Sequence, residues 1–152
     1  MKKPNQALKT LRGDARALVE SCPGALSRRV ARRITQFLDQ ELAETGMSSA
    51  QLALMAQIAA AEDDTLGGLA RRSGLEQSTL SRNLRTLETA GLIEITTIEN
   101  DLRRRAVWLT ETGARRLEVA LPLWRKAQAR LSRVMTPQVI RRVATAAELI
   151  PG

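Results

Sequence analysis

The stretch that decides the fold runs from Thr65 to Thr110: TLGGLARRSGLEQSTLSRNLRTLETAGLIEITTIENDLRRRAVWLT. Its first part predicts two helices, over about Leu66–Arg72 and Glu76–Ala90. Thr65 is a suitable N-cap for the first helix because its hydroxyl can accept a free backbone N–H. The two helices are joined by Ser73-Gly74-Leu75, whose glycine can adopt a positive φ at little steric cost. This order indicates a helix-turn-helix.

The second of these helices has two different faces. Leu80, Leu84 and Leu87 recur at helical spacing and share an apolar face. Gly91 follows as the residue that ends the helix. The remaining positions carry polar and basic side chains that can hydrogen-bond base edges and phosphates in a major groove: Gln77, Ser78, Thr79, Ser81, Arg82 and Arg85. Whether the arginines bond guanine or only phosphate stays open.

A β-hairpin is predicted after the helices. Residues Leu92–Ile98 and Arg105–Leu109 are rich in β-branched or alternating apolar residues and predict two strands. Between them we expect a charged loop over Glu99–Arg104. Its consecutive arginines suit a narrow, negative minor groove, and Asp101 is expected to pair with a neighbouring arginine. The hairpin therefore adds four candidate DNA-binding residues: Asp101, Arg103, Arg104 and Arg105.

Two motifs in this stretch and directly after it resemble a known family. Asp101-Leu102-Arg103, Val107, Leu109-Thr110 and Gly113 follow a D-x-R wing pattern that ends in L-T-x-x-G. Ser78–Arg82 and Leu87–Leu92 resemble its recognition helix. The segment is similar to the DNA-binding domain of the MarR (multiple antibiotic resistance regulator) family. That resemblance implies a mainly α (α+β) fold, a winged helix-turn-helix flanked by N- and C-terminal dimerisation helices.

Further helices are expected on both sides of the central stretch, within one domain of residues 1–152. A helix over 5–20 ends in a break at Ser21-Cys22-Pro23-Gly24, and a second runs from Pro23 to about Thr45 before Gly46. Ser48 and Gln51 fit a capping box for a helix over 49–61. The C-terminal helices are expected over about 111–134, which contains Pro122, and from Thr136-Pro137 to 150.

The flanking helices carry apolar stripes beyond what a winged domain needs to cover itself. We therefore assign dimerisation to residues 5–46 and 111–150, and the winged helix-turn-helix to residues 48–110. Two-fold symmetry then predicts two recognition helices in successive major grooves and a palindromic operator.

Composition limits the possible functions. The net charge is +8 and 20 of the 24 basic residues are arginine, which favours a phosphate-bearing partner. Residues 61–110 nevertheless carry a net charge of −1. The excess lies in the flanks, and includes Arg28, Arg29, Arg32 and Arg33, which either bind a partner or face solvent.

The chain has no histidine and one cysteine, so we expect no metal site, no cofactor and no histidine-based catalysis. It also has no phosphate loop, nucleophile elbow or convergent carboxylate pair, and we predict no enzyme. No segment predicts a membrane span or a signal peptide, so a cytoplasmic location is expected.

Two residues suggest regulation, each with a simpler alternative. Cys22 lies at a helix start, where thiolates are favoured, and some members of the resembling family sense oxidants through an N-terminal cysteine. The organic-hydroperoxide regulators support it with tyrosines, which this chain lacks entirely. The alternative is a small apolar residue at a helix start. Met55 is a candidate for a ligand pocket or for ordinary core.

The leading hypothesis is a homodimeric transcriptional regulator, a repressor that binds double-stranded DNA. The resemblance implies release by a small aromatic or anionic ligand, or by an oxidant. Two other classes remain open. A winged-helix protein–protein adaptor predicts no salt-dependent duplex binding, and a non-specific nucleic-acid binder predicts similar affinity for every duplex.

Overall fold

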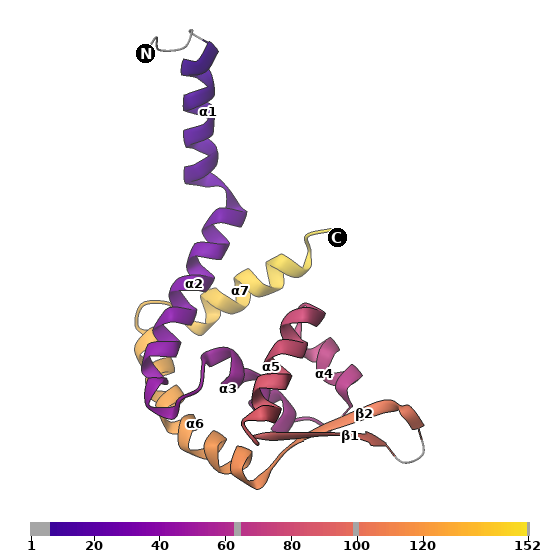
Figure 1. The fold of residues 1–152 in the computed structure, drawn as a ribbon. Helices are drawn as coiled ribbons and strands as arrows, with labels where there is room; N and C mark the ends of the chain where they lie inside the picture. Colours follow the sequence, from indigo (N-terminus) through magenta and orange to yellow (C-terminus); the bar gives the residue numbers. More distant parts are fainter. Residues whose placement is uncertain (1–6, 63–64, 99–100, 152) are drawn as a thin grey trace, which may run out of the picture. The chain divides into compact units, whose positions relative to one another are not determined.

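Figure 1 shows the fold in a computed structural model that describes residues 7–62, 65–98 and 101–151. For residues 7–9, 98 and 101–104 it describes the backbone alone. The chain divides into two compact units, Met1–Phe37 and Leu38–Gly152. Helix α2 (Pro23–Glu41) begins in the first unit and ends in the second.

The first unit contains α1 (Ala7–Ser21) and most of α2. The predicted break over Ser21–Gly24 is wrong in extent, because Cys22 alone separates the two helices. The Cys22 N–H donates to the Leu18 carbonyl (2.9 Å), and the Leu26 N–H donates to the Cys22 carbonyl (3.0 Å). Cys22 thus donates the last hydrogen bond of α1 and accepts the first of α2, and Pro23 costs α2 no bond because it occupies the first position of that helix.

The end of α2 also differs from the prediction. The helix ends at Glu41, and the chain then tightens into the 3₁₀ helix η1 (Ala43–Thr45). The Thr45 hydroxyl donates to the Leu42 carbonyl (2.7 Å) and accepts from the Met47 N–H (3.1 Å). Such tightening satisfies carbonyls that an ending helix leaves free. Gly46, with φ 67°, therefore ends η1 and not α2.

Helix α3 (Ser49–Ala59) begins with the predicted capping box and ends two residues before the predicted Ala61. The Gln51 N–H donates to the Ser48 hydroxyl (3.2 Å), and the Ser48 N–H donates to the Gln51 side-chain oxygen (2.9 Å). Two free donors at the helix start are thereby satisfied.

The helix-turn-helix consists of α4 (Leu66–Ser73) and α5 (Gln77–Thr89). The Thr65 hydroxyl accepts from the Gly68 N–H (3.1 Å), as an N-cap does. Gly74 has φ 60°, in the left-handed region where glycine is favoured. The predicted boundaries are confirmed to within one residue at each end.

The wing is an antiparallel pair, β1 (Ile93–Ile98) and β2 (Asp101–Leu109). Its register runs from Ile93↔Leu109 to Thr97↔Arg105 and then shifts, so that Ile98 pairs with Asp101. The predicted loop is therefore wrong for residues 101–104, which belong to β2, while residues 99 and 100 lie outside the described residues. The shift at Thr97/Ile98 accommodates residues 102–104 within the strand, as an irregular register in an antiparallel pair can.

The C-terminal part consists of α6 (Glu111–Ser132) and α7 (Pro137–Glu148). Both end two residues before their predicted limits. Helix α6 continues through Pro122. Thr136 occupies the N-cap position of α7, but its side chain makes no capping hydrogen bond.

The core lies between α3, the helix-turn-helix, the wing and α6. Its most completely buried large side chains are Leu42, Leu54, Met55, Leu69, Leu87 and Val107. Burying one such side chain contributes about 1.5–3 kcal/mol. Met55 is 0% exposed and packs in this cluster, so the core interpretation of that residue is confirmed.

Two arginines of α6 hold the segment before α3. Arg116 donates to the Thr45 carbonyl (2.8 Å), and Arg130 pairs with Glu41 at the end of α2.

Among the described helices, none combines the length and apolar composition that a membrane span needs.

Candidate nucleic-acid interface

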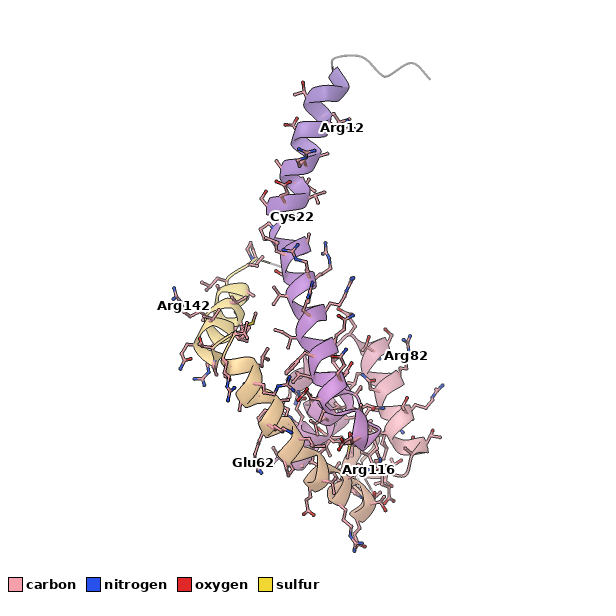
Figure 2. The ribbon with its side chains drawn as sticks, turned by 90° about the vertical axis from the view of Figure 1, so that its left-hand side faces the viewer. Arg12, Cys22, Glu62, Arg82, Arg116 and Arg142 are labelled. Carbon is pink, nitrogen blue, oxygen red and sulfur yellow. The ribbon has the colours of Figure 1, made fainter. Side chains whose placement is uncertain are left out.

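Helix α5 separates its buried and exposed residues as the sequence predicts. Leu80, Leu84 and Leu87 are at most 7% exposed and anchor the helix on the core. All six candidate DNA-binding side chains of this helix are exposed: Gln77, Ser78, Thr79, Ser81, Arg82 and Arg85. Figure 2 shows Arg82 on the outer side of α5. Their donors and acceptors are therefore accessible to an external partner.

The C-terminal end of α5 is held by a Schellman motif. Gly91 has φ 67°, and its N–H donates to the Glu88 carbonyl (2.9 Å). The Leu92 N–H donates to the Leu87 carbonyl (2.9 Å). Both hydrogen bonds of the motif are present, so the predicted role of Gly91 is confirmed. At the other end, Glu76 occupies the N-cap position without a side-chain bond, which leaves α5 N–H groups open to an acceptor.

The wing places Arg105 opposite Thr97 on the neighbouring strand, and the Arg105 side chain is exposed. Thr65 joins the same strand through an antiparallel bridge to Ala106, which links the start of α4 to the wing. The backbones of Asp101, Arg103 and Arg104 lie in β2. The side chains of these three residues are not among those that the structure describes. The ion pair predicted for Asp101 therefore also lies outside the described part of the structure.

Sequence reasoning missed two basic residues in this region. Arg71 and Arg72 lie in the last turn of α4, directly before the turn that leads into α5, and both side chains are exposed. Helix-turn-helix proteins place their first helix across the DNA backbone. Two consecutive arginines just before a predicted turn were the signal that could have identified them.

The remaining candidates lie in the first unit. Cys22 is half-buried and occupies the N-cap position of α2. The four arginines of α2 are all exposed: Arg28, Arg29, Arg32 and Arg33. Within the described chain, no group of three or more histidine, cysteine, aspartate or glutamate side chains is placed to hold a metal ion.

An exposed polar and basic helix on a helix-turn-helix, followed by a two-stranded wing, defines a winged helix-turn-helix DNA-binding protein. Residues 45–104 match the model of the MarR family. The chain is 32% identical to the M. tuberculosis transcriptional regulator MosR in complex with DNA, with a TM-score of 0.77, over 84% of this chain and 95% of that chain. The chain belongs to the MarR family.

Two further solved structures have the same fold. A second MosR structure from M. tuberculosis is 31% identical, with a TM-score of 0.74, over 86% of this chain and 96% of that one. A mutant of MarR from E. coli, complexed with operator DNA, is 23% identical with a TM-score of 0.74, over 88% of this chain and 98% of that one. Comparison with curated protein sequences gives no match. The chain is a DNA-binding transcriptional regulator, of a family that is not enzymatic.

Proposed function

We propose that this chain is a homodimeric repressor that binds a palindromic operator. In this proposal α5 enters the major groove and the wing contacts the adjacent minor groove. A small aromatic or anionic ligand, or an oxidant, then releases the DNA. Residues 48–110 bind DNA, and residues 5–46 and 111–150 form the dimer.

The observation that carries this proposal is the division of α5 into two faces. Three leucines fix one face to the core, so the opposite face has a defined orientation. That face presents amide, hydroxyl and guanidinium groups, which are the groups that bond base edges and phosphates. The placement of its arginines supports DNA binding more than the net charge does, because residues 61–110 as a whole are slightly acidic.

The proposed dimer is supported by apolar side chains that a single chain leaves exposed. On α7, Val139 is 50% exposed, Val143 62% and Ile150, just after the helix, 71%. On α1, Leu11, Leu18 and Val19 are 57–69% exposed. Exposed apolar side chains that gather on a helix are typical of protein–protein interaction sites. A second copy is the simplest cover, since closed two-fold dimers are the commonest oligomers.

Release requires a ligand or modification that favours a dimer geometry unable to bind DNA. The exposed arginines of α2 suit an anionic compound. Cys22 suits an oxidant, since the chain's one thiol is only half-buried at the junction of two helices. Either event would act by changing the separation of the two α5 helices in the dimer.

A genomic selection tests the proposal. Genomic fragments are bound to the purified protein at about 150 mM salt, near physiological ionic strength, and the recovered fragments are sequenced. We expect one palindromic motif with half-sites about one helical turn apart. Equal recovery of every fragment would favour the non-specific nucleic-acid binder. No recovery at this salt concentration would contradict the proposed tight binding to a palindromic operator.

A further inference from the structure

Thr110 connects α5 and the wing, which form the proposed DNA-binding surface, to the first turn of α6. Its backbone N–H donates to the Leu92 carbonyl (3.1 Å), directly before β1. Its hydroxyl donates to the carbonyl of Gly91 (2.7 Å), the residue that follows α5. The same hydroxyl accepts from the Gly113 N–H (3.0 Å) in the first turn of α6. One side chain thus bonds the end of α5 to the start of α6, at the base of the wing (Figure 1).

The Gly91 carbonyl that the Thr110 hydroxyl binds is held in direction by the end of α5. The Leu92 N–H lies in the same peptide plane as that carbonyl and donates to the Leu87 carbonyl in the Schellman motif, so this plane is constrained. Thr110 follows β2 directly, and Leu109 pairs with Ile93 at the same end of the wing. Thr110 is therefore bonded to the residues between the end of α5 and the start of β1, and it directly follows the end of β2.

An ordinary N-cap explains only one of these bonds. Capping requires an acceptor for an N–H in the first turn, which serine, aspartate and asparagine also provide. Donation to the Gly91 carbonyl requires a hydroxyl hydrogen, which a carboxylate does not have. The bond from the hydroxyl to Gly91 spans from the end of α5 to the start of α6 and is additional to capping.

We propose that Thr110 is a positioning residue for DNA binding. Its hydroxyl sets the angle between α5 and the wing by tying the end of α5 to the start of α6, so that both elements reach one duplex together. The inference rests on the proposed DNA surface of α5 and the wing. It predicts that the affinity for DNA depends on the donor at position 110 separately from the stability of α6.

Three variants separate positioning from capping. Thr110→Ser keeps both hydroxyl bonds. Thr110→Asp keeps the cap acceptor but loses the donor to Gly91. Thr112→Asp is the matched control, because it adds the same charge at an exposed position in the same helical turn. The probe is a fluorescein-labelled duplex from the genomic selection, and affinity is measured by anisotropy on protein that circular dichroism shows to be folded.

We expect Thr110→Asp to bind about tenfold more weakly than Thr112→Asp, the equivalent of about 1.4 kcal/mol, and Thr110→Ser to bind like the unmodified protein. A double-mutant cycle that combines Thr110→Asp with Arg105→Gln measures the coupling between the two residues in DNA affinity. A loss of stability alone does not change this coupling. Loss of the wing arginine should cost less affinity in Thr110→Asp than in the unmodified protein, because the wing is already misplaced there. If Thr110→Asp does not fold, Thr110→Ala replaces it in the cycle.

Two results would overturn the positioning role and leave the proposed function standing. The first is equal DNA affinity of Thr110→Asp and Thr112→Asp. The second is a loss of affinity on Arg105→Gln that is the same with Thr110 and with Asp at that position. A different result defines failure of the proposed function. If Arg82→Gln and Arg105→Gln both leave affinity unchanged in the unmodified protein, α5 and the wing do not form the DNA surface, and the inference falls with it.

Discussion

The Cα of Gly113 lies directly against the carbonyl of Leu92. A Cβ added at Gly113 would be 1.9 Å from the Leu92 carbonyl oxygen and 2.8 Å from its carbonyl carbon. Leu92 is itself 5% exposed and belongs to the core, so the contact cannot open without moving buried structure. The first turn of α6 therefore packs on the backbone that leaves α5, and only glycine fits there.

Gly113→Ala should destabilise the protein by about 1–3 kcal/mol, because the added methyl group meets backbone rather than a flexible side chain. Urea denaturation followed by circular dichroism measures the change. Gly67→Ala is the control, because its Cβ would have one ordinary contact, with the Arg71 side chain at 3.7 Å, in the first turn of α4. Alanine at that helical position should be neutral or stabilising by about 0.4–1 kcal/mol. Equal stability of the two variants would contradict the packing argument.

Arg82→Ala should weaken operator binding by about 1–3 kcal/mol, since its exposed guanidinium lies on the proposed DNA-contacting face of α5. The free energy of unfolding should change little, because the side chain is outside the core. Fluorescence anisotropy at fixed salt concentration measures the affinity. Arg142→Ala, an exposed arginine on α7, is the matched control and should leave affinity nearly unchanged. Equal losses for both variants would indicate a general charge effect and count against the assignment.

Val143→Asp should weaken the proposed dimer, because it places a charge on the exposed apolar face of α7. We expect the dimer dissociation constant to rise by at least about tenfold, or 1.4 kcal/mol, as measured by sedimentation equilibrium. Thr145→Asp provides the control, since it adds the same charge to a polar exposed position on the same helix. A dimer that tolerates Val143→Asp as well as Thr145→Asp would exclude this face from the interface.

Cys22→Ser tests release by an oxidant. If the Cys22 thiol is the sensor, peroxide should release DNA from the unmodified protein and not from Cys22→Ser, because the chain contains no other cysteine. Anisotropy before and after peroxide treatment, and again after a thiol reductant, measures release and its reversal. Persistent peroxide sensitivity in the serine variant would remove Cys22 from the mechanism and leave ligand release as the remaining proposal.

The helix-turn-helix could be predicted closely because its signals are local. The N-cap at Thr65, the glycine turn at Gly74 and the leucine spacing in α5 each depend on residues a few positions apart. The N-terminal part of β2 was missed because Asn100-Asp101 and the arginines after it are typical of loops. Pairing with β1 across a register shift extended the strand back to Asp101.

The sequence by itself determined the two faces of α5, the helix ends at Gly74 and Gly91, and the family, since apolar periodicity and glycine conformation act within a few residues. Only the tertiary structure decided that Leu92 and Gly113 touch and that the Thr110 hydroxyl bonds to the Gly91 carbonyl. These contacts join residues from the two sides of the hairpin. Their geometry follows from how β1 and β2 pair and how α6 packs on the core, which no local pattern specifies.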